Sequence, residues 1–297
     1  IADGMWTLRD LTLTTTTHVA NPLCLVATDE GLAALAGLPH LRRLVLRDLP
    51  GIRGTGFSAI AANAVPLEEL EIAVDAPRGS PALLHPRSYL NDDGAEAISE
   101  LAHLRSLTLV NPVHLTDAGL ATLACAASLH ELSISGAAEI TGEGFRAFAG
   151  SEELEMPPSP LHTVVLSDEP IAGFAPNDLP KCIGRLSNAG LSALAEVPKL
   201  ASLSLCAVGD LSGGVDVLVD RAKALRQLAL SDATTAHSLT CGFARSGIAS
   251  GTITRVELRV SEADRSSAPR LPVTRQMLAQ RFPAADILIT PPYALAE

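Results

Sequence analysis

The sequence states one pattern of apolar residues twice, without interruption, between Leu104 and Phe148. Each copy opens with the spacing Leu-x-x-Leu-x-Leu/Ile and closes with a second apolar set at helical spacing, and the copies that begin at Leu104 and Leu129 are offset by 25 residues. A fixed period of this length is typical of a solenoid, in which each unit buries its apolar face only against its neighbours. This repeat constrains the fold more than any other feature of the chain.

The first half of a unit predicts a strand. Leu107 and Leu109 alternate with polar residues, which is the period of a strand with one buried face. Asn111-Pro112 then predicts the end of the strand, because proline has no N–H to donate to a sheet ladder.

The second half of the unit predicts a helix. Thr116 and Asp117 suit a helix start, because their oxygens can accept from unpaired N–H groups and complement the helix dipole. Gly119 has no side chain, so we expect the helix to lie close to the strand below it. Leu120 and Leu123 follow at helical spacing. One unit buries roughly five large apolar side chains, and each burial stabilises the unit by about 1.5–3 kcal/mol. The conformational entropy lost in ordering its backbone offsets this gain, so a single unit is unstable and the units must stack.

The strand pattern recurs along the whole chain. The copies are Leu8-Leu11-Leu13, Leu41-Leu44-Leu46, Leu67-Leu70-Ile72, Leu104-Leu107-Leu109, Leu129-Leu132-Ile134, Leu161-Val164-Leu166, Leu200-Leu203-Leu205, Leu225-Leu228-Leu230, Ile253-Val256-Leu258 and a terminal strand within Ala284–Thr290. Helices are expected at Asp29–Leu38, Gly56–Ala64, Asp92–Leu101, Asp117–Ala126, Gly142–Ala149, Asn188–Val197, Gly214–Ala224, Arg275–Arg281 and, interrupted by Gly242, His237–Ser246.

We therefore expect one repeat domain over residues 1–297, since a repeat array can run this long as one body. Uneven spacing between the strands indicates insertions near 73–90, 151–160, 167–186 and 259–273. Insertions in solenoids form loops on one face, often the binding face. They are equally explained as tolerated decoration, because lengthening a loop costs little entropy.

Composition excludes several classes of partner. The formal net charge of −11 argues against nucleic acid, which normally selects a basic face. No segment reaches the ~18 unbroken apolar residues of a membrane span, and no signal peptide is visible. The chain begins at Ile1 rather than Met, which fits either processing or a fragment.

The cysteines indicate a reducing compartment. They are odd in number and widely dispersed, with no C-x-x-C pair: Cys24, Cys125, Cys182, Cys206 and Cys241. This arrangement favours buried thiols over a disulfide framework or a metal site. We therefore expect an intracellular protein of the cytoplasm or an organelle matrix.

The helix starts carry a resemblance to a known family. They recur as Asp29-Glu-Gly-Leu, Asp92-Asp-Gly-Ala, Thr116-Asp-Ala-Gly-Leu, Thr141-Gly-Glu-Gly-Phe and Ser187-Asn-Ala-Gly-Leu. With the leucine-bearing strands, they resemble leucine-rich repeats of the cysteine-containing, ribonuclease-inhibitor-like subclass, as in F-box leucine-rich-repeat proteins and GALA-type bacterial effectors. The resemblance implies an α/β solenoid of about nine to ten repeats, a horseshoe with a concave parallel sheet and convex helices.

Two features depart from that subclass. A cysteine just after the strand is clear only at Cys206, and no F-box precedes the repeats, so a ubiquitin-ligase role is not implied by the sequence.

In such a fold the strand residues between the leucines line the concave surface. Its centre is then small, hydroxyl-rich and almost uncharged, with charge near both ends, which would suit a closely docked helix or extended segment. The alternative is that small residues only relieve crowding on a curved sheet. The candidate partner-binding residues are Arg43, Arg47, Glu69, Glu71, Thr108, Glu131, Ser133, Arg255, Glu257 and Arg259.

Trp6 is a further candidate, because it precedes a first strand that no amphipathic capping helix covers. An uncapped solenoid end exposes apolar core and unpaired backbone groups. We therefore expect either that another chain covers this end or that a cap has been removed. The alternative is that Trp6 fills the end of its own core.

No catalytic, cofactor-binding or metal site is predicted. The eight histidines are scattered without ligand spacing, although His130 and His162 occupy equivalent places in adjacent strands and are expected to be neighbours. Nucleophile-elbow, P-loop and dinucleotide-binding patterns are missing from the sequence.

The sequence therefore favours a non-enzymatic protein–protein interaction module that binds its partner through the concave face and edge loops. One alternative is an accessory or assembly subunit of a large complex, for instance an organellar one. Another is a ubiquitin-ligase substrate receptor or bacterial effector whose recruiting domain lies elsewhere.

Overall fold

The computed structural model describes residues 6–14, 27–49, 51–74, 88–137, 139–150, 157–167, 186–206, 214–231, 251–259 and 271–290. The strands of its main sheet are β1 Asp10–Thr14, β2 Arg43–Arg47, β3 Glu69–Ala73, β5 Ser106–Val110, β7 Glu131–Ser135, β8 Thr163–Ser167, β9 Ser202–Cys206, β10 Gln227–Ser231, β11 Arg255–Arg259 and β12 Asp286–Thr290. These ten strands form one open sheet whose spatial order follows the chain. Every pairing is parallel, as in the predicted α/β leucine-rich-repeat solenoid.

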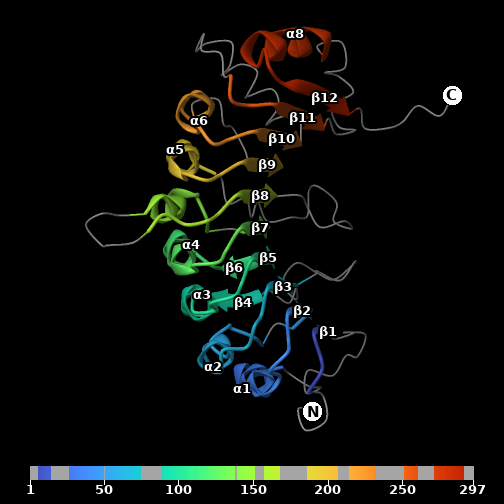
Figure 1. The fold of residues 1–297 in the computed structure, drawn as a ribbon, viewed down its shortest axis with the longest axis vertical. Helices are drawn as coiled ribbons and strands as arrows, with labels where there is room; N and C mark the ends of the chain where they lie inside the picture. Colours follow the sequence, from blue (N-terminus) through green and yellow to red (C-terminus); the bar gives the residue numbers. More distant parts are fainter. Residues whose placement is uncertain are drawn as a thin grey trace, which may run out of the picture.

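Helices connect the strands and stack along one side of the sheet, as Figure 1 shows. They are α1 Asp29–Ala33, η2 Ala34–Gly37, α2 Phe57–Ala62, α3 Asp92–Ser99, α4 Asp117–Thr122, η4 Leu123–Cys125, η5 Glu143–Ala149, α5 Asn188–Glu196, α6 Val215–Arg221 and α8 Leu271–Arg281. Most lie inside the predicted ranges. The predicted helix His237–Ser246 lies outside the described residues.

The leucine triplets face the helices and form the core. Strand register aligns Leu107 with Leu70 on one side and with Leu132 on the other, so the triplets stack in continuous columns. Leu107, Leu120 and Leu123 are each fully buried. One cluster of buried side chains runs from Leu32 to Ile287, which shows how the units stabilise one another.

β5 ends at Val110, as predicted, but Pro112 begins a further strand that the sequence did not predict. After β5, Asn111 takes a left-handed backbone conformation with φ 58°, and Pro112 then begins a second short strand, β6 Pro112–His114. β6 pairs with β4 Ser88–Asn91 in a separate two-stranded sheet. Proline is tolerated there because the first residue of a short strand needs no N–H for the ladder.

Gly119 is required for a different reason from the one predicted. A Cβ built on it would lie 2.2 Å from Oδ1 of Asp92 in the preceding repeat and 2.6 Å from Cδ1 of Leu115. The close approach is therefore between neighbouring helix starts and not between the helix and its strand.

The predicted insertions fall mostly on residues outside the described ranges. At their borders, β4 begins at Ser88, within the predicted insertion 73–90, and α8 begins at Leu271, four residues before the predicted helix and within the predicted insertion 259–273. Ser159, at the end of the 151–160 insertion, is buried, and its backbone N–H donates to the carbonyl of Phe148 at 3.1 Å. This end of the insertion packs into the body of the solenoid.

Candidate functional site

Alternate strand residues point away from the helices and form the strand face, defined as the first, third and fifth residues of each main-sheet strand. In β7, for example, Leu132 and Ile134 are buried, whereas Glu131, Ser133 and Ser135 are exposed or half-buried. Between β5 and β9 this face is built mainly from small hydroxyl residues, with Thr108, Ser133 and Ser204 aligned in adjacent or nearby strands. This part of the strand face therefore presents short side chains, most of them with hydroxyl groups.

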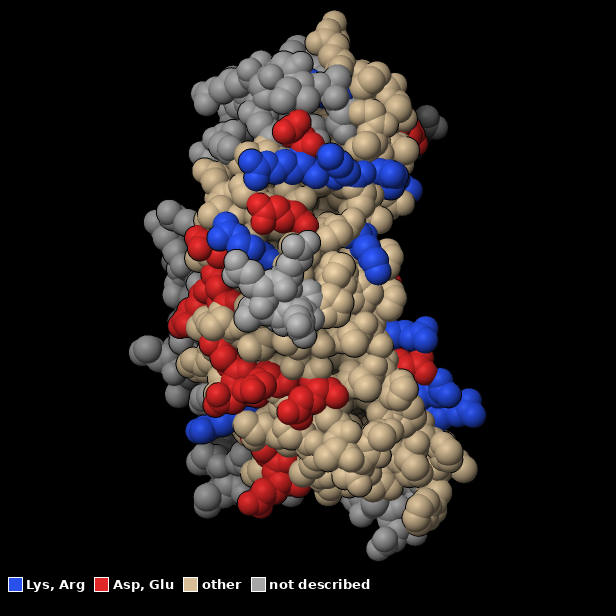
Figure 2. All heavy atoms as spheres, turned by 60° about the vertical axis from the view of Figure 1, so that its left-hand side comes forward, with Lys and Arg blue, Asp and Glu red and all other residues tan. Residues whose placement is uncertain are grey.

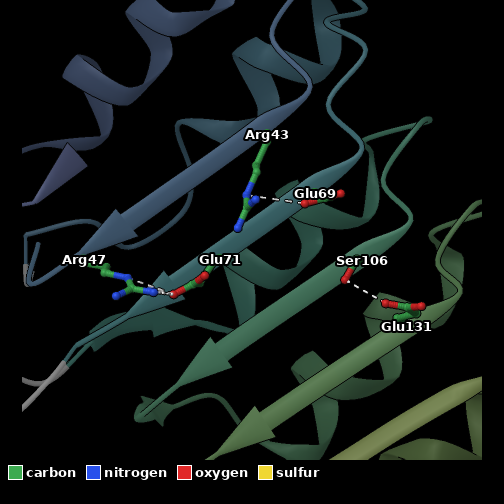
Figure 3. Close-up of polar contacts among 6 residues, drawn as sticks. All are labelled: Arg43, Arg47, Glu69, Glu71, Ser106 and Glu131. Carbon is green, nitrogen blue, oxygen red and sulfur yellow. Dashed lines mark hydrogen bonds and ion pairs between the residues drawn. The ribbon is translucent and has the colours of Figure 1, made fainter. Parts of the chain in front are cut away.

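The strand face near the N-terminus carries two cross-strand ion pairs (Figure 3). Arg47 donates from Nε and Nη2 to Oε1 of Glu71, at 3.0 and 2.7 Å. Arg43 lies beside Glu69, with 3.5 Å between Nε and Oε2. The sequence placed these four residues on one surface. The register of β2 and β3 aligns Arg43 with Glu69, whereas Arg47 is aligned with Ala73 and its side chain reaches Glu71 diagonally.

A shallow hollow of about 190 Å³ lies among these pairs. Its polar lining comes from β2, β3 and β5, namely Arg43, Glu69, Glu71, Ser106 and Thr108. Beyond it, Glu131 of β7 turns back toward β5 and accepts a hydrogen bond from Oγ of Ser106 at 3.3 Å (Figure 3). Charged and hydroxyl groups of four consecutive strands therefore meet in one place.

The predicted strand-face residues of β11 lie far from that hollow. Arg255 and Glu257 form an ion pair within β11, with 3.7 Å between Nη2 and Oε2. Arg259 is the last residue of the same strand, in register with Thr290 of β12. Ser133 lies between the two ends, next to Thr108 in the register of β5 and β7.

Trp6 does not fill the core of the first repeat, because 64% of it is exposed. Leu8, Leu11 and Leu13 pack against the core but remain only half-buried, in contrast with the fully buried triplets of inner repeats. β1 pairs with β2 alone in the sheet order, so this strand has one open side among the described residues.

His130 and His162 are neighbours, as predicted. Their rings stack in parallel with centroids 5.3 Å apart and an interplanar angle of 1°. Within the described ranges, no group of three or more histidine, cysteine, aspartate or glutamate side chains has the geometry to hold a metal ion. No helix in those ranges is long and apolar enough to cross a membrane.

The sequence did not reveal what the helix-start aspartates do. Asp117 accepts from the backbone N–H groups of Thr141, Gly142 and Gly144 in the next repeat, at 2.9, 2.9 and 3.1 Å, and from Oγ1 of Thr141 at 2.6 Å. Thr116 caps this helix, as predicted, because its Oγ1 accepts from the N–H of Ala118.

Asp29 and Asp92 make the same kind of contact. Asp29 accepts from the N–H groups of Arg53, Gly54 and Gly56, and Asp92 from the N–H and hydroxyl of Thr116. We call Asp29, Asp92 and Asp117 the aspartate ladder. The recurrence of Asp two residues before a helix glycine was the available signal.

Cys206 is the last residue of β9 and aligns with Ser167 and Ser231, so it belongs to the strand and does not follow it as predicted. It is buried, whereas Cys125 is exposed at the end of η4.

The helix side of the molecule has a different charge pattern. Acidic residues gather over the lower half of the surface seen in Figure 2, and basic residues form a band nearer the C-terminal end. Exposed acids of α3 and its C-terminal end include Asp93, Glu96 and Glu100. The two sides of the solenoid therefore offer a partner different chemistry.

No family model matches the sequence, and no curated protein matches it. Among solved structures, the chain is similar to one in the yeast Rad7–Elc1 complex, with 16% identity and a TM-score of 0.34 over 96% of this chain and 78% of that chain. It is also similar to the leucine-rich repeat-containing protein LegL7 of Legionella pneumophila, with 16% identity and a TM-score of 0.35 over 94% and 92% of the two chains.

Proposed function

We propose that this chain is a non-enzymatic interaction module that binds a protein partner through its strand face. The observation that carries this proposal is the composition of that face, in which small hydroxyl residues of the central strands lie between charged groups on β2–β3 and on β11. Small side chains allow a partner's backbone to approach closely and form hydrogen bonds, and the flanking charges favour one register over others. The edge loops would extend the contact.

A second candidate role is that of a subunit held in a larger assembly. It is favoured by the first repeat, where Trp6 is exposed and the leucines of β1 are only half-buried. Solenoids normally cover such an end, and tryptophan is a frequent anchor at protein interfaces. A role as ligase receptor or effector would require a recruiting domain, and no feature of the described residues favours it over the first two.

A reducing, intracellular compartment fits this proposal. The five cysteines are widely dispersed in the sequence, with no C-x-x-C pair. Stable disulfides are normally rare inside cells.

Capture of partners from a lysate, read by native mass spectrometry, tests the strand face directly. The variant Arg47→Ala/Glu71→Ala/Arg255→Ala removes charges from both ends of that face. The matched control Arg146→Ala/Glu196→Ala/Arg221→Ala removes the same residue types from an ion-pair group on the helix side. We expect the first variant to capture at least about tenfold less partner, a loss of ~1.4 kcal/mol, and the control to capture as much as wild type.

Equal capture by both variants would reject the strand face as the binding surface. Loss of capture only after Trp6→Ala would favour the assembly role.

A further inference from the structure

The hollow on the strand face is surrounded by more carboxylates than arginines. Arg43 is the cation on its lining, and Arg47 contacts the lining residue Glu71 from outside the hollow. Glu69 and Glu71 line the hollow, and Glu131 adjoins it through Ser106. Glu131 has no salt-bridge partner within the part of the chain that the structure describes. The hollow therefore keeps one unit of negative charge that its own residues do not balance.

The carboxylates also keep capacity to accept hydrogen bonds. Both N–H groups of Arg47 that contact Glu71 go to the same oxygen, Oε1. Glu69 meets Arg43 in a single contact of 3.5 Å, longer than a normal hydrogen bond, and its side chain is 58% exposed. A carboxylate offers about four acceptor positions, so each of these groups can take another donor.

Strand register places two of these carboxylates on either side of one serine. Ser106 is in register with Glu69 of β3 and with Glu131 of β7. Because adjacent strands lie about 4.8 Å apart, the backbones carrying these glutamates are roughly 10 Å apart, with the Ser106 hydroxyl between them. Figure 3 shows the Glu131 carboxylate directed toward that serine.

We propose that this hollow receives an arginine side chain of the protein partner, an inference that rests on the proposed function of the strand face. The guanidinium would lie over Ser106, with one edge toward Glu69 and the other toward Glu131. Its planar group of five donors can reach two carboxylates at once, which the compact ammonium of lysine does less well. Thr108 and Val45 on the lining would contact the aliphatic stem.

A metal ion is the other cation that carboxylates attract, and the geometry disfavours it. No described group of three acidic, histidine or cysteine side chains lies close enough together to hold one. Glutamates spread over β3 and β7 instead suit a cation several ångströms wide.

Short peptides test this without knowledge of the natural partner. The probes are acetyl-Gly-Arg-Gly-amide and its citrulline counterpart, which has nearly the same shape and no charge. Each is titrated into the ¹⁵N-labelled chain, and the backbone amide signals are followed by NMR. We expect the arginine peptide alone to shift the amides of Ser106, Thr108 and Glu131 saturably, with weaker binding at higher salt.

Substitutions locate the site. Glu131→Gln removes the unbalanced charge from an exposed position and should weaken binding of the arginine peptide by roughly two- to fivefold, the range for an exposed ion pair. Glu100→Gln makes the same change at an exposed residue beside α3 and should leave binding unchanged. Equal binding of the citrulline peptide, no effect of Glu131→Gln, or shifts centred on α3 would each overturn the proposal.

These outcomes are separate from those of the capture experiment. If the strand-face triple variant loses its partner while the arginine peptide does not bind, the proposed function stands and the arginine site is wrong. If the peptide binds while capture depends on the helix side, the strand face is not the partner surface and the inference falls with it.

Discussion

Carboxylates connect neighbouring repeats in two regions of this solenoid, and they do so in different ways. On the aspartate ladder, Asp117 binds three backbone N–H groups and one hydroxyl of the next repeat over distances of 2.6–3.1 Å. On the strand face, Glu71 is held by one arginine side chain, and Glu69 lies 3.5 Å from another. The first set is tied to fixed backbone, whereas the second contacts long, half-exposed side chains.

This difference separates stability from recognition. Backbone N–H groups that lose a charged acceptor are costly to leave unpaired, so the ladder stabilises the stack. Exposed ion pairs contribute little and exchange partners easily, so the strand-face glutamates remain available to another chain. The same chemical group, a carboxylate, thus stabilises the fold in one region and belongs to the proposed binding surface in the other.

The largest effect is expected from Asp117→Ala. It leaves three backbone donors of the next repeat without their acceptor, and we expect the free energy of unfolding in urea to fall by about 2–4 kcal/mol. Partner capture should be unchanged where the variant is folded. The control is Asp93→Ala, an exposed aspartate whose Oδ2 accepts from Nδ2 of Asn91, for which we expect a loss below about 1 kcal/mol. Similar losses in the two variants would mean that the ladder has no special role.

A smaller loss is expected from Gly119→Ala. The new methyl group would displace the Asp92 carboxylate, and we expect destabilisation of about 1–3 kcal/mol in the same urea assay. Gly31→Ala is the matched control, because its nearest neighbour would be Oγ1 of Thr28 at 3.8 Å. Alanine suits a helix better than glycine, so this control should gain roughly 0.5–1 kcal/mol. A stabilising Gly119→Ala would contradict the close approach of the helix starts.

The smallest effect is expected on the strand face. A double-mutant cycle on Arg47 and Glu71, with Arg47→Met and Glu71→Gln, should give a coupling free energy of about 0.2–1 kcal/mol in urea unfolding, because the arginine side chain is 50% exposed. A coupling of several kcal/mol would show that this pair holds repeats together as the ladder does, and would remove the contrast between the two regions.

The periodic part of the fold was predictable from the sequence. Leu104, Leu107 and Leu109 recur at a spacing that fixes both the strand and the face it buries, and the parallel register follows from stacking equal units. The second sheet was not predictable, because proline argues against a strand except at the strand's first residue, where no N–H is needed for the ladder. Gly119 was identified as a close-packing residue, but the repeat does not state which neighbour it meets.

The candidate site was predictable as a surface and not as a set of contacts. Alternation along each strand placed Arg47, Glu71 and Glu131 on one face, and equivalent positions made His130 and His162 neighbours. Which charged side chains pair depends on their length and rotamers across neighbouring strands, and the sequence does not give these. The sequence therefore did not indicate that Glu69 has an arginine partner and that Glu131 contacts a serine instead. Whether these residues bind a partner stays a prediction.

The aspartate ladder also bears on how the molecule would come apart under load. Each aspartate of the ladder binds only the repeat that follows its own, and the described contacts lie between α1 and η5. Tension along the long axis would therefore have to break several hydrogen bonds to one carboxylate at once before the repeats joined by it could separate.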